Sequence, residues 1–254
     1  MTIVARPRRH RAAGSRRAAH LADTAGIAEI SRARRVVREL GGRFSLELGI
    51  ELDRDPSEAE RWALAATLFR NRISTAVAMR TYRVLERAGV RTLEDAGRRS
   101  RGELVALLDE GGYARYDERP AARLLALAEV VAARYEGCLA VLGEQVEDPL
   151  ELEQALEALP GWGLVTVHTF LRELRGVWPG ARVALDDRAA RAALHLELPS
   201  RLHALSSFAV AAHLDVRDLE AALVRLSLCH ELTGCPGGEE CPVAALDREQ
   251  VVHF

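Results

Sequence analysis

Apolar residues recur at helical spacing along most of the chain, and turn signals separate one apolar stretch from the next. The stretch from Ile27 to Leu40 predicts a helix that ends at Gly41, because glycine readily takes the left-handed conformation found just after a helix. Further helices are predicted after Ser57, over 75–87, from Thr92, from Ser100, over 117–135, from Pro149, and over 164–175, 187–195, 200–213 and 216–230. Short connections between about ten helices predict an all-α protein.

Two local patterns refine this prediction. Ser57 and Glu60 have the spacing of a capping box, in which each side chain bonds the other residue's backbone N–H. Apolar residues alternate with others from Phe44 to Leu52, which predicts a short extended segment between the first two helices.

The composition suits packed helices and argues against a membrane span. Of the 254 residues, 48% are apolar and only 5% are aromatic, with abundant Ala, Leu, Arg and Glu. This length allows one large domain or two small ones, each with its own core. No apolar run reaches the roughly 18 residues of a membrane helix, and the N-terminal stretch lacks the apolar region of a secretory signal.

Charge is unevenly distributed along the chain. The net charge is −2, but residues 1–20 contain six Arg and no acidic residue. We expect a disordered tail, which is either a solvated extension without function or a contact for nucleic-acid phosphates. All 35 basic residues are Arg, and the absence of lysine excludes a P-loop lysine, a pyridoxal Schiff base and any lysine imine.

Three of the four cysteines lie close together near the C-terminal end. Five residues separate Cys229 from Cys235, and five separate Cys235 from Cys241, whereas Cys138 lies far upstream. In a chain without a predicted secretory signal, such a group favours ligands of a metal ion or an iron–sulfur cluster over a disulfide scaffold.

A glycine-containing turn, Leu159-Pro160-Gly161-Trp162-Gly163, joins two of the predicted helices. The two glycines allow backbone conformations closed to other residues and leave the turn unobstructed. Its N–H groups, at the start of the second helix, can face a phosphate with the helix dipole behind them. The pattern is typical of a helix-hairpin-helix motif, which grips the DNA backbone without reading bases; a plain turn between two helices is the alternative.

This hairpin and several flanking segments resemble the endonuclease III superfamily of DNA glycosylases. The likeness lies in Leu159 to Thr166, in Val183 to Arg188 with the downstream Arg191, and in Gly112 to Tyr116 before a long helix. The cysteine group also falls where many members carry an iron–sulfur loop. The resemblance extends over residues 25–245 and implies an all-α fold of two domains. A six-helix barrel over 57–165 would include the start of the helix-hairpin-helix, and residues 21–56 and 166–254 would form a second helical domain, after the tail at 1–20.

The resemblance also implies a catalytic residue. Asp186 matches the catalytic aspartate of the family, which would stabilise the oxocarbenium-like sugar or help to activate water. Capping of the following helix by Asp186 or Asp187 is the alternative role. Val165 matches the lysine of bifunctional members, so lyase activity is not expected unless the N-terminal amine supplies it. The protein would be a monofunctional glycosylase or a member that has lost catalysis.

Further positions match residues that contact DNA in the family. Gly161, Gly163 and Thr166 would anchor the DNA backbone, and Trp162 at the tip of the turn would either contact DNA or be a packing residue. Asn71 matches a glutamine that fills the space left by a flipped nucleotide, and Arg70 or Arg72 could be inserted instead. Capping of the preceding helix is the alternative role for Asn71.

The cysteine loop departs from the family pattern, C-x6-C-x2-C-x5-C, because one cysteine is missing. A [4Fe–4S] cluster takes four protein ligands, and the fourth beside Cys229, Cys235 and Cys241 would be His230, His253 or Cys138. There are two alternatives to the cluster: a zinc site with three Cys and one His, and a loop that binds no metal.

The function implied by the resemblance is base-excision repair of DNA. The protein would remove a damaged or mismatched base that is flipped from the duplex. The alternative is a non-catalytic helix-hairpin-helix protein that binds distorted or abasic DNA. We expect a monomer that acts on double-stranded DNA, does not bind membranes and resides in the cytoplasm, at the nucleoid in a bacterial cell.

Overall fold

The computed structural model describes residues 26–55, 57–70, 73–113 and 118–245. Within these ranges the chain forms helices and no strand, apart from one isolated bridge between Arg175 and Trp178, which confirms the all-α prediction. None of the helices found there combines the length and apolar character needed to cross a bilayer. The Arg-rich tail, Asn71, Arg72 and His253 lie outside the described residues, so their predicted roles stay predictions.

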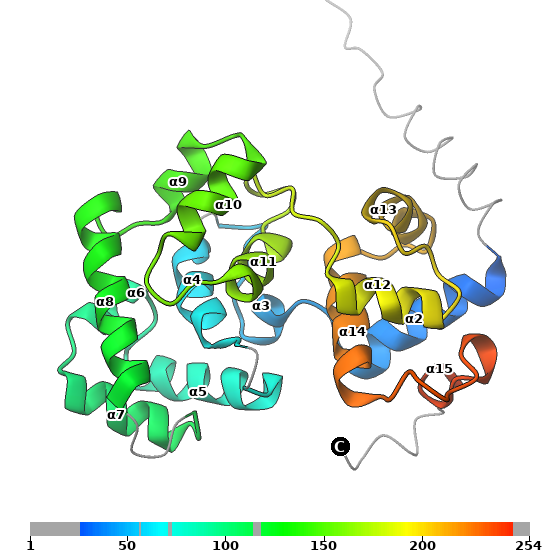
Figure 1. Ribbon diagram of the computed structural model, residues 1–254, viewed down its shortest axis with the longest axis horizontal. Helices are drawn as coiled ribbons and strands as arrows, with labels where there is room; N and C mark the ends of the chain where they lie inside the picture. The colour runs from blue at the N-terminus through cyan, green and yellow to red at the C-terminus, as the bar shows by residue number, and fades with distance from the viewer. Residues whose placement is uncertain (1–25, 56, 71–72, 114–117, 246–254) are drawn as a thin grey trace, which may run out of the picture. The chain divides into compact units, whose positions relative to one another are not determined.

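The described chain divides into two compact units (Figure 1). Each unit has its own apolar core. The larger unit is one continuous segment, 43–183, and the smaller unit joins residues 26–42 to residues 184–245 among those described. The predicted boundaries at 56/57 and 165/166 fall inside the larger unit. Most apolar side chains of 44–52, and Val167, Phe170 and Leu171 in the second helix of the hairpin, are buried in the larger core, which explains the difference.

The larger unit is built around one central helix. Its helices are α3 (Phe44–Glu47), α4 (Glu58–Leu68), α5 (Thr75–Arg87), α6 (Leu93–Gly97), α7 (Arg101–Glu110), α8 (Glu118–Tyr135), α9 (Ala140–Gln145), α10 (Pro149–Glu157) and α11 (Leu164–Glu173). In α4 every residue from Trp62 to Ala66 is fully buried, and the helix packs against α5, α6 and α11. A helix that is apolar on all sides over this stretch is expected to be enclosed by others.

The segment from Phe44 to Leu52, predicted to be extended, begins instead with helix α3. The buried carboxylate of Glu173 accepts hydrogen bonds from the N–H groups of Phe44, at 2.9 Å, and Ser45, at 2.8 Å. These are the first amides of a helix, which have no acceptor inside it. A residue 129 positions after Phe44 thus caps α3, and the local alternation could not reveal this.

Local caps begin several other helices. Thr92 and Ser100 open α6 and α7 with complete capping boxes. The capping box predicted for Ser57 is wrong, because Ser57 itself has helical backbone angles, φ −66° and ψ −20°, and its side chain makes no cap bond. A carboxylate oxygen of Asp55 instead accepts a hydrogen bond from the Ser57 N–H at 2.9 Å.

The smaller unit is also built around one helix. Its elements are α2 (Ile27–Leu40), α12 (Asp187–His195), α13 (Leu202–Ala211), α14 (Val216–Cys229), the short 3-10 helix η1 (Gly238–Glu240) and α15 (Pro242–Ala245). Helix α14 packs against α2, α12 and α13, and all its residues from Leu219 to Val224 are buried. The N-terminal helix α2 therefore completes a core that is otherwise made by the C-terminal part of the chain.

Candidate nucleic-acid interface and metal centre

Helices α10 and α11 form the predicted hairpin. Asp148 caps the start of α10, and a ring nitrogen of His168 on α11 lies 2.8 Å from a carboxylate oxygen of Glu153 on α10. Gly161 is exposed and has φ +80°, a conformation that favours glycine. His168 therefore links the two helices, and the turn between them depends on the glycine found in the sequence.

The start of α11 lacks a side-chain cap. Its N-cap residue is Gly163, which has no side chain to offer, and the amides of Thr166 and Val167 already bond the Gly163 carbonyl at 2.9 and 3.0 Å. The first amides of the helix, those of Leu164 and Val165, have no acceptor within it. They lie at the positive end of the helix dipole, where an anion is favoured.

Two hairpin residues that are candidates for DNA contact have side chains that pack inside the larger unit. Trp162 is buried, and its indole N–H donates to the hydroxyl oxygen of Thr67 at 3.0 Å. Thr166 is also buried, and its hydroxyl donates to the carbonyl of Phe69 at 3.3 Å. Both side chains therefore fix the hairpin on the end of α4, which agrees with the packing alternative for Trp162. Gly161 and Gly163 are exposed, and contact between DNA and this turn stays a prediction.

Two arginines lie beside the hairpin turn. A methyl group built on Gly161 would lie 3.9 Å from a guanidinium nitrogen of Arg70 and 4.0 Å from the Cβ of Arg123. Both arginines line a depression of about 20 Å³ together with Tyr113 and Gly161. Burial raises the pKa of Tyr113, and the two arginine charges oppose that rise. A volume near that of one water molecule does not admit a nucleobase. The two guanidinium groups beside the exposed turn are the feature that could contact a phosphate.

Arg70 was a candidate from the sequence, but Arg123 was not. Arg123 lies on α8, and nothing local in that helix marks which of its arginines faces the hairpin. Only the packing of α8 beside the turn brings it there.

Asp186 is the N-cap residue of α12. One of its carboxylate oxygens accepts a hydrogen bond from the Arg188 N–H at 2.7 Å, and its own N–H donates to the carboxylate of the buried Glu220 at 3.0 Å. Asp187 is exposed in the first turn of the helix. The capping role therefore belongs to Asp186, and its half-buried carboxylate lies at a helix N-terminus. Its catalytic role stays a prediction.

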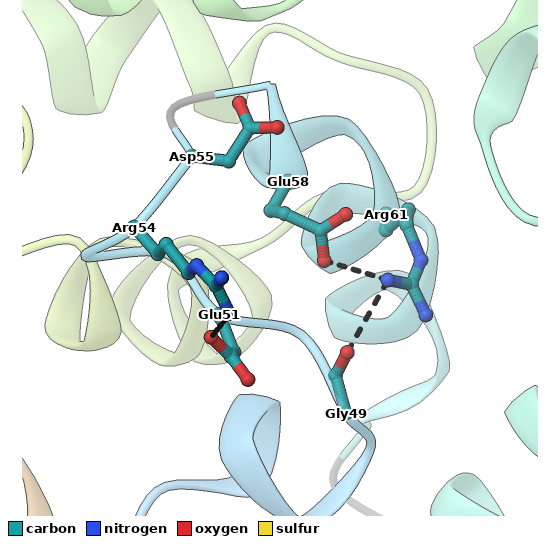
Figure 2. A pocket seen from close by; sticks show the side chains of 6 residues that line it. All are labelled: Gly49, Glu51, Arg54, Asp55, Glu58 and Arg61. Atoms are coloured by element: carbon teal, nitrogen blue, oxygen red, sulfur yellow. Dashed lines mark hydrogen bonds and ion pairs between the residues drawn. The ribbon is translucent and has the colours of Figure 1, made fainter.

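A larger hollow of about 400 Å³ lies elsewhere in the larger unit and is lined by charged groups (Figure 2). Three carboxylates and two guanidinium groups line it, and two of the carboxylates pair with the two guanidinium groups. Arg61 bonds Glu58 at 2.6 Å, and Arg54 bonds Glu51 at 3.3 Å. Because carboxylates outnumber arginines there, this hollow does not suit the DNA phosphate backbone.

A group of four potential metal ligands lies in the smaller unit. His195, His230, Cys235 and Cys241 bring their potential ligand atoms within 4.8 Å of one another. His195 is at the end of α12, His230 directly follows α14, and the two cysteines flank the loop that contains η1. The predicted ligands Cys235 and Cys241 therefore come together, and they do so with two histidines.

Cys229 is not part of this group in the described structure. It is exposed, and its sulfur lies 3.8 Å from the carbonyl oxygen of Leu226 in its own helix. Cys138, considered above as a fourth ligand, lies in the larger unit beside Glu60. His195 was not among the candidates, because it is distant in sequence from the cysteine loop and only the packing of α12 against α14 brings it there.

A scan of protein-family models finds no match to this chain, and a search of curated proteins finds none either. The likeness to endonuclease III relatives therefore rests on the hairpin and flanking segments quoted above.

Proposed function

We propose that this protein binds duplex DNA through the α10–α11 hairpin and removes a damaged or mismatched base as a monofunctional glycosylase. Its main support is the uncapped start of α11 behind the exposed Gly161, with Arg70 and Arg123 alongside. Backbone amides and guanidinium groups around one unobstructed turn are suitable donors for a DNA phosphate. Such contacts position the duplex without reading its sequence.

Under this proposal Asp186 supplies the chemistry. The bond between the deoxyribose C1′ and the base nitrogen breaks, and the base leaves with the bonding electron pair and takes up a proton. The Asp186 carboxylate stabilises the positive charge that develops on the sugar, and water adds its hydroxyl to C1′. Because the chain contains no lysine, no side-chain imine forms, and the abasic strand keeps its phosphodiester bonds.

The test is a panel of duplexes that each carry one lesion, incubated with the protein and analysed before and after hot alkali. We expect strand breaks only after alkali. Asp186→Asn should bind DNA and lose this product, because asparagine keeps the helix cap but not the charge. The matched control is Asp187→Asn, the exposed neighbour, which should keep the product. Equal product from the wild type and Asp186→Asn would exclude Asp186 as the catalytic group.

A non-catalytic protein that binds distorted or abasic DNA is the second candidate. The observation in its favour is that an Asp186 carboxylate oxygen is already engaged as the cap of α12. Tight binding to lesion duplexes without strand breaks on any of them, with or without alkali, would establish this candidate instead.

A further inference from the structure

The resemblance to endonuclease III relatives implies a [4Fe–4S] cluster, but the donor set in the smaller unit does not fit one. Such a cluster has four irons, and each takes its own ligand, usually a thiolate. The group contains two thiols and two imidazoles, and all four ligand atoms lie within 4.8 Å of one another. Four ligands gathered so closely leave no space for a cube of iron and sulfide between them, and Cys229 lies outside the group.

The same donors have the composition and spacing of a site for a single zinc ion. Zinc binds cysteine sulfur at about 2.3 Å and histidine nitrogen at about 2.0–2.1 Å in a tetrahedron, so neighbouring ligand atoms are about 3.6 Å apart. The sulfur of Cys241 lies 3.7 Å from the Nε2 atom of His230. No two of the four potential ligand atoms are more than 4.8 Å apart, so the side chains need to move only slightly closer together to bind one zinc ion.

A second, independent observation points to a ligand at this position. The Nε2 atom of His195 is buried and has no hydrogen-bond partner among the described residues. A buried polar atom of this kind is costly unless something binds it. A metal ion among these four side chains would accept its lone pair.

The backbone around the group is closely fitted to α12. Gly237 and Gly238 have φ values of +77° and +52°. A methyl group on Gly237 would lie 2.5 Å from the carbonyl oxygen of His195, and one on Gly238 would lie 2.9 Å from the carboxyl group of Glu197. These glycines allow the loop between the two cysteines to lie directly on the end of α12.

We propose that His195, His230, Cys235 and Cys241 bind one Zn²⁺ ion in a closed, structural site. Four protein ligands leave no open position for water or substrate, which distinguishes a structural zinc site from a catalytic one. The ion would fasten the loop after α14 to the ends of α12 and α14. The segment from His230 to Ala245 carries three glutamates and no arginine, so it does not suit contact with phosphate. This proposal does not depend on the DNA glycosylase activity.

The first experiment is elemental analysis of the full chain purified without added metal. We expect about one zinc per chain, with neither stoichiometric iron nor acid-labile sulfide. Cys235→Ser and Cys241→Ser should lose most of the zinc. The matched controls Cys229→Ser and Cys138→Ser, which change the two cysteines outside the group, should retain it.

A cobalt experiment separates loss of a ligand from loss of folding. Co²⁺ in place of zinc should give the intense visible bands of a tetrahedral site with two thiolates. His195→Cys exchanges one ligand for another, so it should still bind one metal ion, with a stronger thiolate-to-cobalt band. Iron with sulfide in the wild type, zinc loss from Cys229→Ser, or failure of the wild type to bind either zinc or cobalt would each overturn the proposal.

Discussion

The indole N–H of Trp162 donates a hydrogen bond to the hydroxyl oxygen of Thr67, 3.0 Å away, and so connects the hairpin turn to the central helix α4. The same indole meets the ring of Phe170 edge-on, at 5.0 Å between centroids. Phe170 is joined to α4 in turn, because its carbonyl accepts the indole N–H of Trp62 at 3.1 Å. The position of the turn is thus set by the core beneath it as well as by its glycines.

Replacing Trp162 by Phe should loosen this connection. The variant loses the hydrogen bond to Thr67 and part of a buried ring, so we expect the free energy of unfolding to fall by about 1–3 kcal/mol. Affinity for duplex DNA should fall with it, because the turn is less well positioned. Urea unfolding and fluorescence anisotropy with a labelled duplex measure the two effects. Trp178→Phe is the control: this buried indole packs on the same Phe170 ring but lies outside the hairpin, so its loss should leave DNA affinity unchanged.

The Gly161→Ala variant, compared with Gly176→Ala, distinguishes the stability lost to backbone strain from the affinity lost with a DNA contact. Alanine at φ +80° should cost about 1–2 kcal/mol of stability, since a Cβ disfavours this conformation. Gly176 has nearly the same φ, +81°, is exposed and has open space around it, so Gly176→Ala should cost the same. Only Gly161→Ala should weaken DNA binding, by about tenfold, because its methyl group obstructs the approach of the phosphate. Equal DNA affinity in the two variants would exclude the turn as the contact.

The two arginines beside Gly161 should contribute to the salt dependence of DNA binding. If Arg70 and Arg123 each contact a phosphate, replacing either by Gln should reduce the slope of log affinity against log salt by about 0.9. Arg134 is the matched control, because it is an exposed arginine at the other end of α8, the helix that carries Arg123. Titrations of a labelled duplex at several salt concentrations measure the slope. An unchanged slope for both Arg70→Gln and Arg123→Gln would remove them from the interface.

Features encoded by neighbouring residues could be predicted from the sequence, and features made by distant residues could not. The periodicity of α2 and the capping boxes at Thr92 and Ser100 are local, and the structure contains them. Helix α3 was not predictable, because its cap comes from Glu173 in another helix.

The same distinction holds for the candidate sites. The glycine turn of the hairpin is visible in the sequence, but the burial of Trp162 and the approach of Arg123 depend on how α4 and α8 pack. Two cysteines of the metal centre were predicted from their spacing. His195 joins them only because α12 packs along α14.

Glu60 gives the last prediction, on the pH dependence of stability. Its Oε1 atom accepts a hydrogen bond from the Ala140 N–H at 2.9 Å, whereas its Oε2 atom is buried without a partner among the described residues. Burial raises the pKa of this carboxyl above its ordinary 4.5, and the bond from Ala140 only partly opposes the rise. An acid with a raised folded-state pKa binds its proton more tightly in the folded protein than in the unfolded chain. Its contribution to stability is therefore greatest below the unfolded-state pKa and is lost as the pH rises through the folded-state pKa.

Glu60→Gln should remove this dependence, because the amide stays neutral and its oxygen can still accept the Ala140 N–H. The free energy of unfolding of the variant, relative to that of the wild type, should increase from about pH 4 upward and level off once Glu60 is ionised in the folded protein. Urea unfolding at a series of pH values measures this difference. Glu144→Gln, which changes an exposed carboxylate on α9, should give a profile parallel to that of the wild type. If the free energy of unfolding of Glu60→Gln also changed with pH in parallel with that of the wild type, the Glu60 carboxyl would have the same pKa in the folded protein and in the unfolded chain.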